Sequence, residues 1–149
     1  MPLTKIEQLQ NERLLEFLTL SKCNLSNANL KTIDKNIFNF THIAELNLSE
    51  NKLEILPKKL KKFKNLQWLI LSDNCFEYLP NTIGKLLNLE SLYLAGNNLK
   101  KLPKNIIKLR KLKYLSLLDN EDLVLSNEQL QWLEQLKVYG CKVYYQDKI

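Results

Sequence analysis

An apolar pattern that returns every 23 residues limits this chain to a small set of folds. The repeats start at Leu20, Ile43, Leu66, Leu89 and Leu112. Between Leu89 and Arg110, leucines first alternate with other residues, as in a strand, and then recur with the spacing of a helical turn. One strand–turn–helix unit cannot bury a face alone, so such units must stack to form a core. The spacing therefore predicts a solenoid of stacked repeats.

Each unit combines three local signals. An LxL segment predicts a strand whose leucines point inward and whose intervening residues point outward. An asparagine follows it, and its amide group offers both a donor and an acceptor to loop backbone within and between units. In three units a proline then fixes φ where the chain enters a short helical segment. The asparagines are Asn51, Asn74, Asn97 and Asn120, and the prolines are Pro57, Pro80 and Pro103.

The pattern LxxLxLxxNxLxxLPxxIxxLxx, present five times in register, resembles the leucine-rich repeat in its 23-residue class. The resemblance covers residues 14 to 145. It implies an α/β solenoid shaped like a horseshoe, with about six parallel strands on the concave face and short helical turns on the convex side. It also implies a protein–protein interaction module that has no catalytic activity of its own.

We predict a single domain over residues 1–149, in which residues 20–125 form five repeats between an N-terminal cap (1–19) and a C-terminal cap (126–149). Caps are expected because the open end of a stack would expose its core. Apolar positions in residues 4–18 predict a capping helix. Ser126 and Gln129 form a capping-box pattern for a helix near residues 127–139, which Gly140 would end. The CKVYY segment would add the last strand.

Two departures from the pattern are expected to change local structure. Ala28 replaces the asparagine of the first unit, so the row of asparagines should begin at Asn51. Residues 119–122 place acidic side chains in the fifth unit where an apolar residue belongs.

Large apolar residues gather at outward strand positions in units three to five. The fold sends these positions to solvent, where such residues need an explanation. Trp and Tyr also supply much of the binding energy at protein interfaces. We hypothesise that another protein, or a second copy of the chain, binds this concave patch and its acidic rim; the alternative is an aromatic ladder that stabilises the sheet. The candidate residues are Glu45, Trp68, Ile70, Asp73, Glu90, Tyr93, Tyr114, Leu118 and Asp119.

The chain carries a net charge of +6, and its lysines form two clusters expected on the convex and flanking sides. An alternative function is therefore binding of nucleic acid or an anionic surface through this basic flank. We favour a solvated lysine coat, because no aromatic residue is interleaved for base stacking. The clusters are Lys58, Lys59, Lys61, Lys62 and Lys64, and Lys100, Lys101, Lys104, Lys108, Arg110 and Lys111.

No residue pattern predicts an enzyme, a metal site or a cofactor. No nucleophile, base and orienting group can be placed together. One histidine and three scattered cysteines do not make a zinc site, and residues 119–122 lack the glycine and the glutamate of a calcium loop. The cysteines form no CxxC pair, and no apolar run follows Met1 or reaches membrane-spanning length. These features predict a cytoplasmic protein, or alternatively a secreted one whose leader is absent from this sequence.

Overall fold

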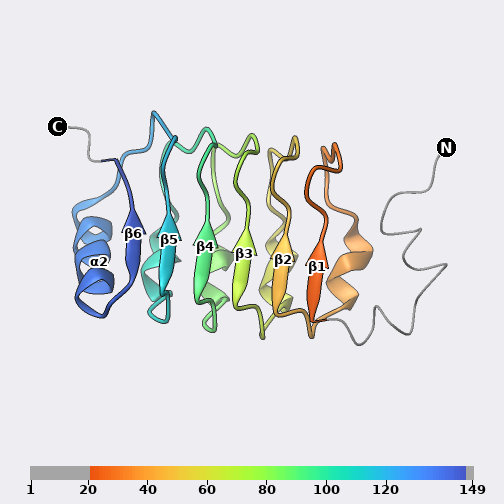
Figure 1. Cartoon of the computed structure of the whole chain (residues 1–149), viewed down its shortest axis with the longest axis horizontal. Helices are drawn as coiled ribbons and strands as arrows, with labels where there is room; N and C mark the ends of the chain where they lie inside the picture. The colour runs from red at the N-terminus through yellow and green to blue at the C-terminus, as the bar shows by residue number, and fades with distance from the viewer. Residues whose placement is uncertain (1–20, 147–149) are drawn as a thin grey trace.

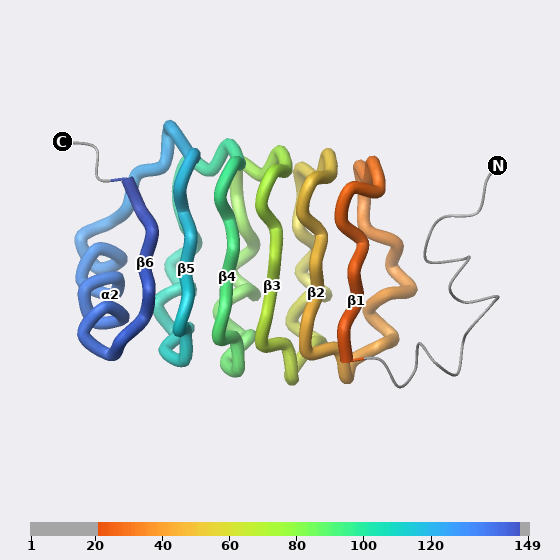
Figure 2. Tube along the Cα trace, in the orientation of Figure 1, coloured from red at the N-terminus to blue at the C-terminus, as the bar shows by residue number. Residues whose placement is uncertain are grey.

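The computed structural model describes residues 21–146, in which short strands alternate with short helices (Figures 1 and 2). The predicted N-terminal cap over residues 1–19 lies outside the described residues. The elements labelled η are 3-10 helices. In chain order the elements are β1 (Lys22–Asn24), η1 (Lys35–Asn39), β2 (Glu45–Asn47), η2 (Lys58–Lys62), β3 (Trp68–Ile70), η3 (Asn81–Lys85), β4 (Ser91–Tyr93), η4 (Lys104–Lys108), β5 (Tyr114–Ser116), α2 (Asn127–Val138) and β6 (Lys142–Tyr144).

The six strands form one parallel sheet in the order β1 to β6. Partners are 23 residues apart from β1 to β5, and 28 residues apart between β5 and β6. Leu69, for example, aligns with Leu46 on one side and Leu92 on the other. Figure 1 shows the helices as a second layer behind the sheet. One side of the sheet therefore packs on the core, and the other, called here the sheet face, lies toward solvent. The predicted solenoid with a parallel sheet of six strands is confirmed.

The core is one continuous cluster of buried side chains contributed by every repeat. The central residue of each strand points into it, and Leu69, Leu92 and Leu115 are fully buried. Each helix adds an aliphatic residue from the opposite layer, such as Ile83 in η3 and Ile106 in η4. This two-layer packing follows from the alternation of inward and outward residues in the strands. Within residues 21–146, no helix is both long and apolar enough to cross a membrane.

Buried asparagines tie neighbouring repeats together. Asn74 Nδ2 donates to the carbonyls of Leu48 (2.9 Å) and Leu71 (3.2 Å), while its Oδ1 accepts from the Leu53 N–H (3.0 Å). Asn51 accepts from the Ala28 N–H at 3.1 Å, so the row begins at Asn51, as predicted. Because each amide group bridges two loops, the backbone groups of those loops are satisfied without water. The same arrangement recurs at Asn97 and Asn120.

The acidic stretch in the fifth unit is accommodated by a local shift. Asp122 is exposed, and the following residue, Leu123, fills the core in its place. The regular pattern returns at Leu125, which lies 23 residues after Leu102 and is also buried. The interruption therefore changes the loop without breaking the core.

The predicted C-terminal helix is confirmed as α2. Its capping box is present, because Ser126 Oγ accepts from the Gln129 N–H and Gln129 Oε1 accepts from the Ser126 N–H, both at 3.2 Å. Gln129 Nε2 also donates to the Leu102 carbonyl (3.0 Å), which anchors the helix to the fourth repeat. Gly140 follows with φ +88°, the left-handed conformation expected after a helix. The last strand, β6, then extends the sheet.

Replacing Gly84 with alanine should destabilise the stack. A Cβ at this position would overlap the backbone carbonyl of Asn105, because η3 lies close against η4. Forcing a methyl group into packed structure costs about 1–3 kcal/mol, so we expect that decrease in the free energy of unfolding, measured by urea denaturation. Lys61→Ala, an exposed change at the equivalent position of η2, should alter it by less than about 0.5 kcal/mol. Equal effects of the two changes would refute this account.

Candidate protein-binding surface

The nine predicted residues lie on or beside four adjacent strands. Five of them are strand residues of β2 to β5. Side chains along a strand alternate between the core and the sheet face, and these five occupy the positions on the sheet face. Asp73, Leu118 and Asp119 follow the strands, and Glu90 immediately precedes β4. Parallel pairing in register brings the apolar members together. Ile70 aligns directly with Tyr93, for example.

Three tyrosines form a stack across the last three strands of the sheet. The ring centroids of Tyr93 and Tyr114 are 4.5 Å apart with the planes 28° from parallel. The next pair, Tyr114 and Tyr144, has centroids 5.3 Å apart. Tyr144 was not among the predicted residues. Its neighbour Val143 aligns with the inward Leu115. Alternation from that inward position would have placed Tyr144 on the sheet face.

Small residues lie between the rings. Ser91 aligns with Trp68 on one side and Tyr114 on the other, and Ser116 aligns with both Tyr93 and Tyr144. Both serines are buried, although their strand positions face away from the core. Partners on adjacent strands are only about 4.8 Å apart, so the larger neighbouring side chains shield them from water. An aromatic ladder, the alternative to a binding patch, is thus present among the tyrosines.

Trp68 differs from the tyrosines in its surroundings. It lies on β3, with Ser91 of β4 between it and Tyr114 of β5. Its side chain retains 36% of its accessible surface, a large exposure for an indole. Tyr144, at the other end of the patch, retains 42%. Apolar surface is therefore available at both ends of the tyrosine stack.

Tyr114, the middle residue of the tyrosine stack, is uncharged at physiological pH. Burial raises the pKa of the Tyr114 phenol, and the neighbouring Tyr144 and Tyr93 phenols raise it further. Since an ordinary tyrosine already titrates near pH 10, Tyr114 keeps its proton in neutral solution. The centre of the sheet face thus offers aromatic surface and hydroxyl groups, and Tyr114 adds no charge to it.

The predicted acidic rim is only partly present. Glu45 Oε2 lies 3.1 Å from Lys22 Nζ, and Glu90 Oε2 lies 2.8 Å from Lys113 Nζ. These lysines were missed, although each lies 23 residues from its glutamate, a spacing that the repeat makes adjacent. The remaining two acids, Asp73 and Asp119, are exposed at the ends of their strands. Among the four predicted acids, only these two are without an ion-pair partner in the described part of the chain.

The lysine clusters lie away from the sheet face, as predicted, and many of their residues belong to η2 and η4 in the opposite layer. The expectation that no aromatic residue is interleaved with them is wrong. Tyr78 lies beside Lys100 and Lys101, whose Nζ atoms are 5.9 Å and 5.6 Å from the centroid of its ring. Sequence reading missed it because the lysines belong to the repeat after Tyr78. Residues 23 apart become neighbours only in the folded stack.

No arrangement for metal or thiol chemistry was found in the described part of the chain. Within residues 21–146, no three His, Cys, Asp or Glu side chains are grouped so that they could hold a metal ion. Cys23, in β1, and Cys141, immediately before β6, are both buried. Burial raises the pKa of the Cys141 thiol and keeps it protonated.

Comparison with protein families agrees with this architecture. Residues 58–148 match the family described as leucine-rich repeat region, and residues 18–76 match a second model described as leucine rich repeat. The first match alone spans more than half of the chain, so the chain belongs to the leucine-rich repeat family. Comparison with curated proteins found no match.

Solved structures with the same fold come from bacteria and plants. A leucine-rich repeat protein of Leptospira interrogans is 30% identical (TM-score 0.66), and the match covers 89% of this chain and 38% of that protein. The ectodomain of the Arabidopsis thaliana receptor kinase SOBIR1 is 26% identical (TM-score 0.65), covering 81% and 66%. The Arabidopsis GASSHO1/SCHENGEN3 ectodomain is 25% identical (TM-score 0.60), covering 78% and 14%. The chain thus matches less than two thirds of each of these relatives.

Proposed function

We propose that this chain is a protein-interaction module without catalytic activity of its own, and that it binds a partner protein through the sheet face. The observation that carries the proposal is the exposed indole of Trp68 beside the tyrosine stack. Trp and Tyr dominate the binding energy of protein interfaces. An uncharged centre with charge at its edge is also the usual layout of such interfaces.

The proposed contact surface contains Trp68, Ile70, Tyr93, Tyr114 and Tyr144. Leu118 extends it toward the edge where the strands end, and Asp73 and Asp119 add negative charge there. A partner segment with apolar anchors and a few basic residues suits this surface. Glu45 and Glu90 lie farther from the negative edge and are already paired with lysines, so they would contribute little to such a contact.

A solved relative supports a binding role for the fold. The GASSHO1/SCHENGEN3 ectodomain was crystallised in complex with CASPARIAN STRIP INTEGRITY FACTOR 2. For the present chain we infer the class of partner, a protein, from the composition of the sheet face. The sheet face could equally bind a second copy of the chain and form a homodimer.

The double substitution Trp68→Ala with Tyr93→Ala tests the proposal. It should weaken partner binding, or dissociate a homodimer, by at least about 2 kcal/mol, a loss of about 30-fold in affinity. Self-association can be measured by sedimentation, and other partners can be captured from the source cells and then titrated by calorimetry. The control is Val138→Ala with Tyr139→Ala, which removes two still more exposed side chains at the C-terminal end of α2.

The control should bind like the wild type. If the sheet-face double substitution binds equally well, the sheet face is not the binding surface. If instead it unfolds as readily as Leu92→Ala, the rings serve the sheet alone, as an aromatic ladder would. Folding is checked for every variant by circular dichroism before affinity is compared.

A further inference from the structure

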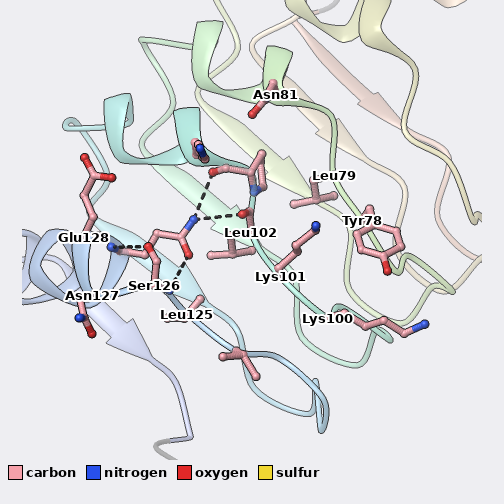
Figure 3. Close-up of a pocket in the computed structure, with 14 residues that line it drawn as sticks. Tyr78, Leu79, Asn81, Lys100, Lys101, Leu102, Leu125, Ser126, Asn127 and Glu128 are labelled. Carbon is pink, nitrogen blue, oxygen red and sulfur yellow. Dashed lines mark hydrogen bonds between the residues drawn. The ribbon is translucent and has the colours of Figure 1, made fainter.

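A second surface lies on the flank of the stack, away from the sheet face. A groove of about 940 Å³ lies between the segment leading into η4 and the segment that begins α2. Figure 3 shows the residues that line it. Its apolar lining includes Leu79, Leu102 and Leu125, and Tyr78 lies at one end of the residues that line it. A smaller groove of about 320 Å³ adjoins it one repeat earlier and shares Tyr78 and Leu79.

Exposed apolar residues follow this flank at the repeat spacing. Ile55, Tyr78 and Val124 retain 77%, 49% and 69% of their accessible surface. Tyr78 lies 23 residues after Ile55, and Val124 lies two repeats after Tyr78, with Lys101 at the intervening position. Equivalent positions in stacked units align, so these four side chains form a row along the flank, called here the flank row. Exposed apolar groups arranged in this way mark an interaction surface.

The two grooves beside the flank row carry net positive charge. Lysines outnumber glutamates four to two among the residues that line the two grooves: Lys58, Lys100, Lys101 and Lys104 against Glu54 and Glu128. Lys100 Nζ is held by Glu77 Oε2 at 2.7 Å, and this hydrogen bond raises the pKa of Lys100. Lys101 is not in an ion pair, and its ammonium lies near the Tyr78 ring. An anionic group that reaches the groove would therefore meet a positioned cation.

We infer that the flank row binds an extended acidic segment of another protein, with its apolar side chains beside Tyr78 and Val124 and its carboxylates on Lys101 and Lys104. Alternate repeats lie about 10 Å apart, close to one three-residue turn of an extended polyproline II chain, in which residues three apart lie on the same side. Apolar residues three apart, with acidic residues between and around them, would match the row. This site is distinct from the sheet face.

The composition of the groove favours a peptide over nucleic acid. Single-stranded nucleic acid requires an aromatic platform for successive bases, and the groove offers one exposed ring, Tyr78. Its lining combines leucine, valine and proline side chains with polar ones, and one of its lysines, Lys100, is already paired with Glu77. A peptide with aliphatic side chains and a few carboxylates therefore matches this groove better than the phosphate backbone of a nucleic acid.

Fluorescence anisotropy with a defined probe tests the inference. The probe is a fluorescein-labelled peptide Glu-Leu-Glu-Glu-Leu-Glu, titrated with the full chain at physiological salt. Tyr78→Ala and Lys101→Glu should each weaken its binding by about tenfold or more. The matched control is Lys62→Glu, which makes the same charge change on an exposed lysine of η2 outside both grooves. Its affinity for the peptide should stay within about twofold of the wild type.

Three results would overturn the inference. The first is no measurable binding of the peptide, and the second is equal weakening by Lys62→Glu, which would indicate general charge attraction. The third is tighter binding of a labelled single-stranded oligonucleotide than of the peptide at the same salt concentration. The sheet-face double substitution Trp68→Ala with Tyr93→Ala should retain peptide binding, so the two surfaces are tested independently.

Discussion

Replacing Asn97 with alanine should lower the free energy of unfolding by about 3 kcal/mol or more. Asn97 Nδ2 donates to the carbonyls of Leu71 and Leu94, both at 3.0 Å, and its Oδ1 accepts from the Phe76 N–H at 3.2 Å. All three bonds lie in the buried interior of the stack. Alanine would leave these backbone groups without partners, and each such buried group costs about 1–3 kcal/mol. Some relaxation of the loop would reduce the sum.

The neighbouring residue provides the control. Asn98 has an exposed side chain, and only its backbone N–H is used, as a donor to the Phe76 carbonyl at 3.0 Å. Asn98→Ala should therefore change the free energy of unfolding by less than about 0.5 kcal/mol. Urea denaturation of both variants measures the difference. A similar loss for the two substitutions would contradict the assignment of Asn97 as the buried bridging residue.

The repeat spacing accounts for most of what could be predicted. A 23-residue period with an LxL segment sets the parallel register, because inward leucines must align to share one core. The asparagine contacts follow from the same period, since an amide group at each repeat is placed between two loops. Local chemistry alone predicted α2, because Ser126 and Gln129 form a capping box whatever the packing around them.

The composition of the surfaces was harder to predict. The Lys22–Glu45 and Lys113–Glu90 ion pairs join adjacent repeats, and a reading of one unit at a time overlooks them. These ion-pair partners could have been found by comparing residues 23 apart in the sequence. The stacking of Tyr93 on Tyr114 is diagonal between strands, so it depends on how the rings turn above the small serines. The period fixes which backbones align but leaves side-chain rotation undetermined.

The grooves beside Tyr78 show a second limit of sequence reading. The larger groove depends on how α2 begins after the irregular fifth unit, because Ser126 to Gln129 line it. Leu123 replaces Asp122 in the core there, and Val124 is left exposed. A pattern of apolar residues does not report such a local shift, because both Leu123 and Leu125 satisfy it. The spacing of the flank row is present in the sequence, but the exposure of Val124 between two buried leucines was visible only in the folded chain.

Leu92→Ala should be among the most destabilising single changes in the chain. Leu92 is the inward residue of β4, fully buried between its register partners Leu69 and Leu115. Truncating a buried leucine removes transfer free energy and leaves a cavity, which together cost about 2–5 kcal/mol. The loss should fall toward the upper end of this range, because neighbouring repeats on both sides hold the cavity open. Thermal and urea unfolding of the variant measure the effect.

The preceding repeat supplies a control of identical chemistry. Leu87 retains 55% of its accessible surface, so Leu87→Ala removes the same atoms without opening a cavity and should cost less than about 0.5 kcal/mol. Similar losses for the two leucines would show that the inward register of β4 is wrong. The stability loss of Leu92→Ala also serves as the reference for the double substitution on the sheet face. Because Trp68 and Tyr93 point away from the core, their double substitution should destabilise the chain far less than Leu92→Ala while reducing partner binding more.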